Sequence, residues 1–350
     1  MATTSYGVND TLAVKVWAKK LFVDALKETK ADQFMGKTSS SLIHVKDDLA
    51  KSAGDKITVG LRMQLSGDGV LGDGTLEGNE ESLATYADSV VIDQLRHATR
   101  SAGKMSEQRV PFSVREENKV GLADWYANRI DTAFFNQICG YTLQTDTKYT
   151  GNQAPVGPNT ANRIWATGTD DVSQGATNIF NLNTLDAAVE RTQTLFPTIR
   201  PLKIGGDKKF VAFLHPYQVY DLRTNTSTGQ WLDIQKAAMM GGKESGNPIY
   251  TGALGEYNGV ILHQDSRVTV GISNAGATVT TVRRAVVCGA QAAVFAYGGD
   301  GGQEMTWVEE LFDYKNQLGV SAGMIWGLKK TVFNSLDFGV LTISTYAAAH

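Results

Sequence analysis

Hydrophobic and polar positions alternate strictly along the stretch that follows Gly54. The apolar positions share one face: Ile57, Val59, Leu61, Met63 and Leu65. The polar positions occupy the other face: Lys56, Thr58, Arg62, Gln64 and Ser66. Because successive side chains of a strand point to opposite faces, this pattern predicts a strand with one buried and one solvated face. A glycine-rich acidic stretch and a second strand-like stretch follow, so we expect a long hairpin arm.

A helical pattern begins directly after Pro111. Ser113 and Glu116 have the spacing of a capping box, and Gly140 is a suitable C-terminal stop. Apolar residues recur between them every three or four positions: Val120, Ala123, Ala127, Ile130, Phe134 and Ile138. A helix over 113–139 that rises ~1.5 Å per residue is about 40 Å long. The sequence therefore predicts a rod-like helix beside the arm.

The rest of the chain mixes helices with segregated strands. Further helices are expected from Asp10 or Thr11 to about Lys30, from a cap at Asn183 through Phe196, and from His215-Pro216 onwards. Strands are expected at Phe210 to Leu214 and within 252–270, 279–297, 304–312, 319–333 and 337–346. Phe34 to Leu49 is expected to be irregular, and Tyr141 to Asn181 to form a long loop or short strands. This mixture predicts an α+β architecture.

Charge is distributed unevenly along the arm. Met63 to Leu95 contains seven carboxylates and no lysine or arginine, whereas Arg96 to Arg115 is mainly cationic. An acidic tip and a basic base on one hairpin cannot easily meet within one subunit, so we expect contacts between copies. The predicted contact residues are the apolar face named above together with Glu77, Glu80, Glu81, Arg96, Arg100 and Arg109. Two solvated loops of chance composition remain the alternative.

Composition is that of an ordinary globular protein, with room for two lobes in 350 residues. The net charge of −3 gives no bulk polybasic character, and the two cysteines, Cys139 and Cys288, are expected to be reduced core residues. No window approaches the ~20 apolar residues that a membrane helix needs, and no signal peptide is recognisable. The simplest expectation is a soluble cytoplasmic protein without membrane partners.

Two glycine motifs resemble catalytic signatures but lack their context. Residues 67–72 spell G-x-G-x-x-G, yet an acidic strand-like stretch follows where a phosphate-binding helix should begin. Residues 319–323 spell G-x-S-x-G around Ser321, with Asp337 and His350 in hydrolase order, but the pattern continues as a strand rather than turning into a helix. The carboxylates of the arm lack calcium-loop spacing, and the five histidines are scattered. We therefore expect no catalytic residue, cofactor or metal.

Five segments, in this order along the chain, carry a resemblance to a known family: 54–58 (GDKIT), 76–81 (LEGNEE), 215–223 (HP with DLR), 251–260 (TGALGEYNGV) and 323–330 (GMIWGLKK). Together with the order of elements, they resemble the major capsid proteins of tailed double-stranded-DNA phages, which have the Hong Kong 97-type fold. Within that class the chain is most similar to the N-four-type family of podophages.

The resemblance implies a division of the chain into named parts. It assigns 1–53 to an N-terminal arm, 54–110 to an extended E-loop, and 111–201 to a peripheral domain with the long spine helix. It assigns 202–303 to an axial domain and 304–350 to the strands that return to the peripheral domain. It also implies pentamers and hexamers in an icosahedral shell around DNA, built in the host cytoplasm with a portal and, in some relatives, a decoration protein. The early start of the first helix suggests a separate scaffolding protein or a chain that has already been processed, and Met1 favours the former.

Three alternatives remain at this stage. An encapsulin-type nanocompartment shares the fold but encloses cargo enzymes. A serine hydrolase would use Ser321, and a decoration or tail protein would seldom need both a long helix and an arm. We expect a structural shell protein that is not an enzyme.

Overall fold

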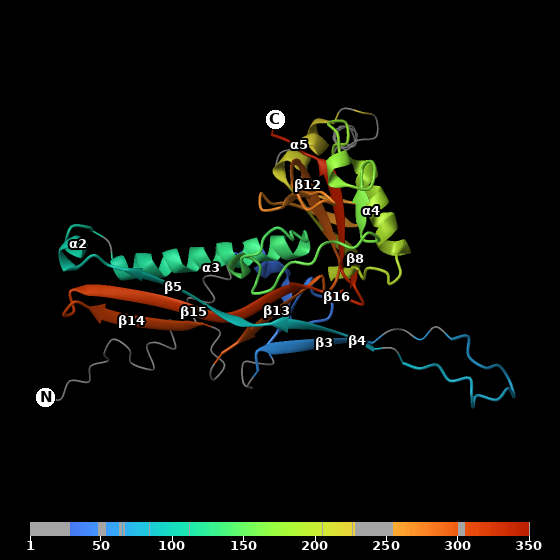
Figure 1. Cartoon of the computed structure of the whole chain (residues 1–350), viewed down its shortest axis with the longest axis horizontal. Helices are drawn as coiled ribbons and strands as arrows, with labels where there is room; N and C mark the ends of the chain where they lie inside the picture. Colours follow the sequence, from blue (N-terminus) through green and yellow to red (C-terminus); the bar gives the residue numbers. More distant parts are fainter. Residues whose placement is uncertain are drawn as a thin grey trace.

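The computed structural model describes residues 29–47, 54–62, 65, 67–83, 85–111, 113–204, 206–225, 227, 255–299 and 305–349. The expected N-terminal helix, from Asp10 or Thr11, lies almost entirely outside the described residues. Met63 and His350 also lie outside them. Two large sheets, one long helix, several shorter helices and a projecting two-stranded arm make up most of the described part of the chain (Figure 1). This confirms the α+β expectation.

The first sheet lies along the long axis of the molecule. Its order is β1 (Met35–Gly36), β2 (Ile43–Lys46), β13 (Ala293–Gly298), β15 (Gln317–Lys330) and β14 (Thr306–Phe312), with β5 (Asp93–Arg100) on the other edge of β15. The prediction that Phe34 to Leu49 is irregular is wrong for β2, which pairs in parallel with β13. A four-residue strand carries too little alternation to be recognised without its distant partner.

The long helix α3 (Val114–Ile138) covers one face of the first sheet. Ser113 caps it by accepting the backbone N–H of Glu116 at 3.4 Å, and Gly140 follows its end with φ of 63°, a backbone conformation that favours glycine. The predicted helix is confirmed, except that Val120, expected on the apolar face, is 52% exposed. Short helices flank it: α2 (Lys104–Gln108) before it and η3 (Thr147–Tyr149) after it.

The second sheet forms the core of a separate lobe. Its order is β6 (Arg163–Trp165), β18 (Val340–Tyr346), β12 (Thr278–Cys288), β8 (Asp207–Leu214), β10 (Val260–Gln264) and β9 (Glu256–Tyr257), with β11 (Val270–Ile272) on β12 and β7 (Leu202–Ile204) on β8. The helices α4 (Leu182–Thr194) and α5 (Pro216–Thr224) belong to this lobe. The expected cap of α4 is wrong by two residues, because Asn181 rather than Asn183 accepts the N–H of Thr184.

The two lobes share buried side chains. Phe213 of β8 makes edge contacts with Phe134 and Phe135 of α3, and with Phe34 of the 3-10 turn η1 (Asp32–Phe34). The two sheets do not coincide with the domain ranges that the resemblance implies. Residues 304–350 were assigned to the peripheral domain, but β18 within them pairs with β12 of the second sheet. Short elements complete the structure: η4 (Asp171–Ser173), β16 (Val332–Phe333) and β17 (Leu336–Asp337).

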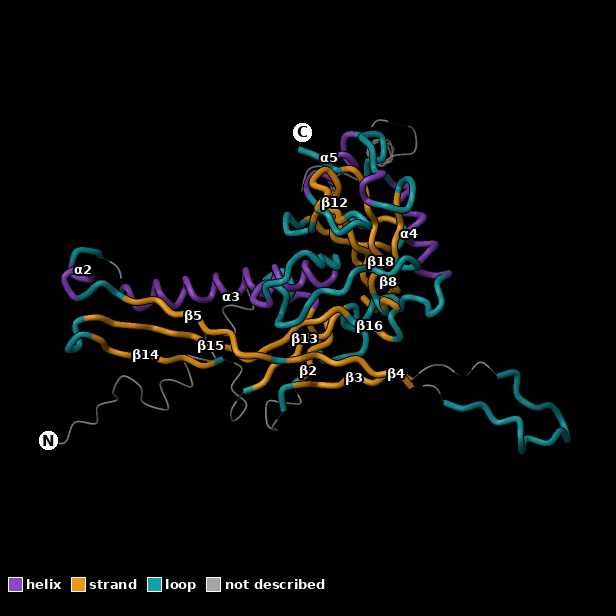
Figure 2. Tube along the Cα trace, in the orientation of Figure 1, coloured by secondary structure: helices purple, strands orange, loops and turns teal. Residues whose placement is uncertain are grey.

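The arm consists of β3 (Lys56–Arg62), β4 (Thr85–Val91) and the loop between them, and it extends beyond the sheets (Figure 2). The strand is shorter than its alternation predicts, since β3 ends at Arg62. The arm is also shorter than expected, because β5 joins the first sheet and α2 follows it there. We call residues 67–83 the arm tip.

Candidate contact surfaces of the arm

The base of the arm is buried by its own chain. Ile57 is 4% exposed, and it forms a cluster with Val90, Ile92 and two residues of β13, Val294 and Ala296. The prediction that a neighbouring copy buries the whole alternating face is therefore wrong for Ile57. The reason is that the base of the hairpin lies on the first sheet, which the local pattern does not reveal.

Asp88 fixes the arm to the body. Its carboxylate accepts hydrogen bonds from Lys329 Nζ and, at 3.1 Å, from the backbone N–H of Val332. Lys329 Nζ also donates to the carbonyl of Ser89 at 3.2 Å. Sequence reasoning counted Asp88 among the acidic tip residues and missed this role, since its partner lies 241 positions away.

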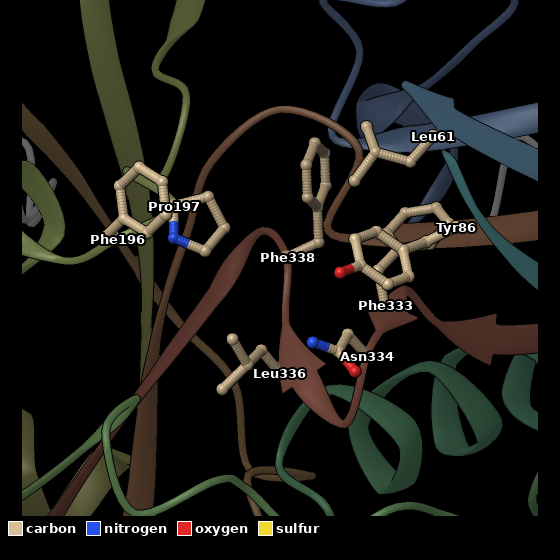
Figure 3. A pocket seen from close by; sticks show the side chains of 8 residues that line it. All are labelled: Leu61, Tyr86, Phe196, Pro197, Phe333, Asn334, Leu336 and Phe338. Carbon is tan, nitrogen blue, oxygen red and sulfur yellow. The ribbon is translucent and has the colours of Figure 1, made fainter. Parts of the chain in front are cut away.

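An apolar pocket of about 250 Å³ lies beyond this anchor, where the arm leaves the body. Its lining combines side chains of the arm, of the β16–β17 hairpin and of the segment after α4: Leu61, Tyr86, Phe196, Pro197, Phe333, Asn334, Leu336 and Phe338 (Figure 3). Leu61 is half-buried here, and Val59 packs against the base cluster. The alternating face thus changes gradually from buried at Ile57 to exposed at Leu65.

The arm tip exposes apolar and acidic side chains together. Leu71 is 93% exposed and Leu76 is 63% exposed. Each begins a tight turn, closed by hydrogen bonds from Gly74 N–H to Leu71 O at 3.2 Å and from Asn79 N–H to Leu76 O at 3.0 Å. A carboxylate follows each leucine closely, Asp73 in the first turn and Glu77 in the second.

The three glutamates predicted as contact residues differ in their surroundings. Glu81 accepts the backbone N–H of Gly67 at 2.7 Å, and Glu80 accepts that of Gly78 at 2.8 Å. These two carboxylates therefore shape the tip. Glu77 is exposed and makes no hydrogen bond or ion pair with the part of the chain that the structure describes.

The predicted cationic residues lie away from the arm tip, on β5 and after α2. Arg96 and Arg100 are exposed on β5, and Arg109 follows α2; these elements extend away from the arm along the long axis (Figure 1). The guanidinium of Arg100 lies 4.3 Å from the ring centre of Phe312 on β14. The acidic and basic groups of one chain are thus held apart, as the sequence predicted.

The catalytic motifs lack the geometry that their chemistry needs. Ser321 lies in the middle of β15, paired with Ala98 and Val308, whereas a nucleophile elbow is a strand-to-helix turn. No helix follows Gly72, because the arm tip continues as turns and extended chain. Among the described residues, no group of three or more histidine, cysteine, aspartate or glutamate side chains is arranged to hold a metal ion. Within the same residues, no helix is long and apolar enough to span a membrane.

The remaining candidate residues are structural. His215 caps α5 by accepting the N–H of Tyr217 at its Nδ1, while its own N–H donates to Gln218. Cys139 and Cys288 are buried free thiols, and burial raises the pKa of both. These observations confirm that a helix begins at His215-Pro216 and that the two cysteines are buried in the core.

A long helix over a sheet, a second lobe and a projecting hairpin define the class of the Hong Kong 97-type capsid subunit. The family model described as "Phage capsid protein" matches residues 5–349, and the chain belongs to this family. It is 29% identical to the major capsid protein of Pseudomonas phage KPP25, over 95% of this chain and 94% of that protein.

Solved capsids have the same fold. The capsid of Ralstonia phage GP4 has a TM-score of 0.78 and 33% sequence identity, with 99% of both chains covered. The capsid of cyanophage Pam1 has a TM-score of 0.75 at 19% identity, covering 100% of this chain and 95% of that chain. The chain is accordingly a major capsid protein, a structural component of a phage virion that forms the capsid shell. This confirms the predicted family and function over the nanocompartment and hydrolase alternatives.

Proposed function

We propose that copies of this chain assemble into pentamers and hexamers that tile an icosahedral shell around double-stranded DNA. The single observation that carries the proposal is the separation of charge along the chain. The arm tip presents exposed carboxylates at one end of the molecule, and β5, which extends away from the arm, presents exposed arginines (Figure 1). Groups that are complementary but cannot meet within one chain favour a repeated head-to-tail contact between copies.

The parts of the chain then have separate roles. The arm is the E-loop, α3 is the spine helix of the peripheral domain, and the second lobe, which combines most of 202–303 with β6, α4 and β18, is the axial domain at the capsomer centre. The contact residues within this proposal are Leu61, Met63 and Leu65 of the stem, Glu77, Glu80 and Glu81 of the tip, and Arg96, Arg100 and Arg109 of the basic end. Val59 is half-buried against the base cluster and contributes less.

The proposal extends to partners of different chemistry. A separate scaffolding protein, a portal protein and a decoration protein would act during assembly in the host cytoplasm. The packaged DNA would be contacted without sequence specificity, because a net charge of −3 leaves only local groups of cations for phosphate contacts. The role is structural, and no catalytic residue is assigned.

The experiment that tests this function is assembly of the purified full chain. We expect sedimentation and negative-stain electron microscopy to show closed shells, with or without an added scaffolding protein from the same phage. A chain that stays monomeric at high concentration under both conditions would contradict the proposal. Leu61→Asp is the informative variant, since it places a charge at the exit of the arm, and it should abolish shells while leaving the monomer folded.

A further inference from the structure

Three successive cross-strand pairs of the arm differ in how they are held. In order away from the body they are Val59 with Asp88, Gly60 with Ala87, and Leu61 with Tyr86. The first pair is fixed, because the Asp88 carboxylate accepts hydrogen bonds from Lys329 and from the backbone N–H of Val332. The third pair lines the apolar pocket. The arm is therefore anchored on one side of the Gly60–Ala87 pair and borders an open space on the other side.

Neither space nor backbone conformation requires a glycine at position 60. A Cβ at Gly60 would meet no described atom within 4 Å, and Gly60 lies outside the left-handed region that favours glycine. Its cross-strand partner, Ala87, has only a methyl group and is exposed. A glycine inside a strand weakens it, because the backbone keeps more freedom and no side chain packs there. The role that remains for Gly60 is flexibility at this one pair.

The pocket has two apolar walls that face each other across open space (Figure 3). Leu61 and Tyr86 of the arm form one wall, and Phe196 and Pro197, which follow α4, form the other; Phe338 lies between them. Leu61 and Tyr86 are partly exposed, and Phe196 is 84% exposed. Because burial of apolar surface is favourable, closing these walls over the pocket of about 250 Å³ would stabilise the chain.

The weak pair lies where a bend would close the pocket. Since side chains alternate along a strand, Leu61 and Tyr86 point towards the body, and Gly60 and Ala87 lie on the outward face. A bend towards the body at the weak pair carries the two larger side chains onto Phe196. The arm projects on the side of the second lobe that carries α4 (Figure 1), so the same bend moves the distant arm tip towards α4.

We infer that the arm is a hinged lid that closes on its own chain, bending at the Gly60–Ala87 pair until Leu61 and Tyr86 cover Phe196. In the closed position Leu61, a contact residue of the proposed shell, is hidden from other copies. The closed position is an autoinhibitory contact of the unassembled chain, and assembly has to open it. The autoinhibitory role rests on the proposed function, whereas the hinge and its closed position do not.

A distance between two spin labels tests the closure. Leu71→Cys labels the arm tip and Ala187→Cys labels α4; both positions are exposed, and the native cysteines are fully buried. Double electron–electron resonance on the unassembled chain should show two distance populations, the shorter one from the closed lid. This population should not depend on protein concentration. If it grows with concentration, a second copy covers Phe196 and the inference is overturned.

Two variants identify the hinge and the opposite wall. Gly60→Val favours the straight strand and Phe196→Ser removes the wall, so each should reduce the shorter population about threefold or more. Thr58→Val is the control, because Thr58 is exposed on the same outward face within the anchored part of β3. It should leave both populations unchanged. A single population in the unsubstituted arm, or two populations that neither Gly60→Val nor Phe196→Ser changes, overturns the inference.

The rate of assembly tests the autoinhibitory role. Gly60→Val and Phe196→Ser should each speed shell formation about threefold, because a larger fraction of chains is open, and Thr58→Val should not. Unchanged or slower assembly of the first two variants overturns this role. Absence of shells from the wild-type chain contradicts the proposed function, while the distance measurement still decides whether the lid closes.

Discussion

The lobe around the second sheet and the arm tip differ in how far one chain provides the partners of its own side chains. In the lobe, charged groups are buried with their partners: Asp171 lies between Arg163 and Arg284 and also accepts the N–H of Ile272 at 2.8 Å. In the arm tip, leucines and carboxylates face solvent together.

This difference teaches where the chain is complete by itself. A buried residue of the lobe contributes to the free energy of folding of one copy. An exposed leucine of the tip contributes almost nothing until another surface covers it, when it stabilises the contact by ~1.5–3 kcal/mol. The base of the arm is intermediate, because Ile57 is already covered and Leu61 only half so. Four variants, from the largest expected change in folding free energy to the smallest, test this comparison.

Asp171→Ala should have the largest effect on folding. Burial raises the pKa of Asp171, but the guanidiniums of Arg284 and Arg163 outweigh burial and hold that pKa below its ordinary value. Removal of the carboxylate leaves two buried cations without a counter-charge, which should reduce the free energy of unfolding by about 3–5 kcal/mol. Urea unfolding followed by circular dichroism measures it.

The neighbouring Asp170→Ala is the control for this variant. Its carboxylate accepts one backbone N–H, from Asn274 at 3.0 Å, so the loss should be about 1 kcal/mol. Equal losses for the two variants would mean that the buried ion network does not distinguish the lobe from the exposed parts of the chain.

Ile57→Ala should have the next largest effect, confined to the arm base. Truncation of this buried side chain should reduce local stability by about 2–4 kcal/mol, because it leaves a cavity against β13. Amide hydrogen exchange at β3 and β4 measures the loss, since the base can open without the lobe. Leu65→Ala is the matched change at an exposed position further along the same face. In that variant the protection of the β3 and β4 amides against exchange should hardly change.

His215 links the stability of the lobe to pH. Burial and the nearby Arg283 lower the pKa of His215 to about 4, with a smaller opposing influence from Asp265. Its Nδ1 caps α5 by accepting the backbone N–H of Tyr217, which only an unprotonated Nδ1 can do, so the folded state favours the neutral ring. In the unfolded chain a histidine has a pKa near 6.5. The contribution of neutral His215 to the free energy of unfolding is therefore complete above about pH 6.5 and decreases as the pH falls towards 4.

We expect this decrease to be about 1–2 kcal/mol in urea unfolding between pH 7 and pH 4.5. His215→Asn keeps a good capping side chain and removes the titration, so its stability should lack this component. An unchanged pH dependence in His215→Asn would assign the effect to other groups of the lobe.

Local patterns predicted the elements well where caps and periodicity extended over many residues. The helix from Ser113 to Gly140 and the helix that begins at His215-Pro216 are the clearest examples. The ordered segments from 54–58 to 323–330 carried the family resemblance. Patterns failed where a distant partner decides the structure, as for β2, which forms because β13 lies beside it.

The candidate contact residues were only partly accessible to sequence reasoning. Alternation predicts that one face of β3 is buried, but it does not predict which surface covers that face. In the structure Ile57 is covered by residues of its own chain. Charge counting grouped Asp88 with the tip, although it anchors the base through Lys329. A groove beside Ser321 is lined by residues of three strands, β5, β14 and β15. These strands come from distant parts of the sequence, so the local G-x-S-x-G motif does not reveal the groove.

Leu76→Ser should have the smallest effect on folding and a large effect on assembly. A solvent-exposed side chain outside any buried cluster changes the free energy of unfolding by less than about 0.5 kcal/mol. Under the proposed contact between copies the same side chain is covered in the shell, so its loss should raise the protein concentration needed for assembly about tenfold or more. Val172→Ser, at an equally exposed position of the second lobe, should change neither quantity. If Leu76→Ser destabilises the monomer by more than 1 kcal/mol, the tip is packed in the single chain and the comparison fails. If it assembles like the wild type, the exposure of the tip has no part in the shell.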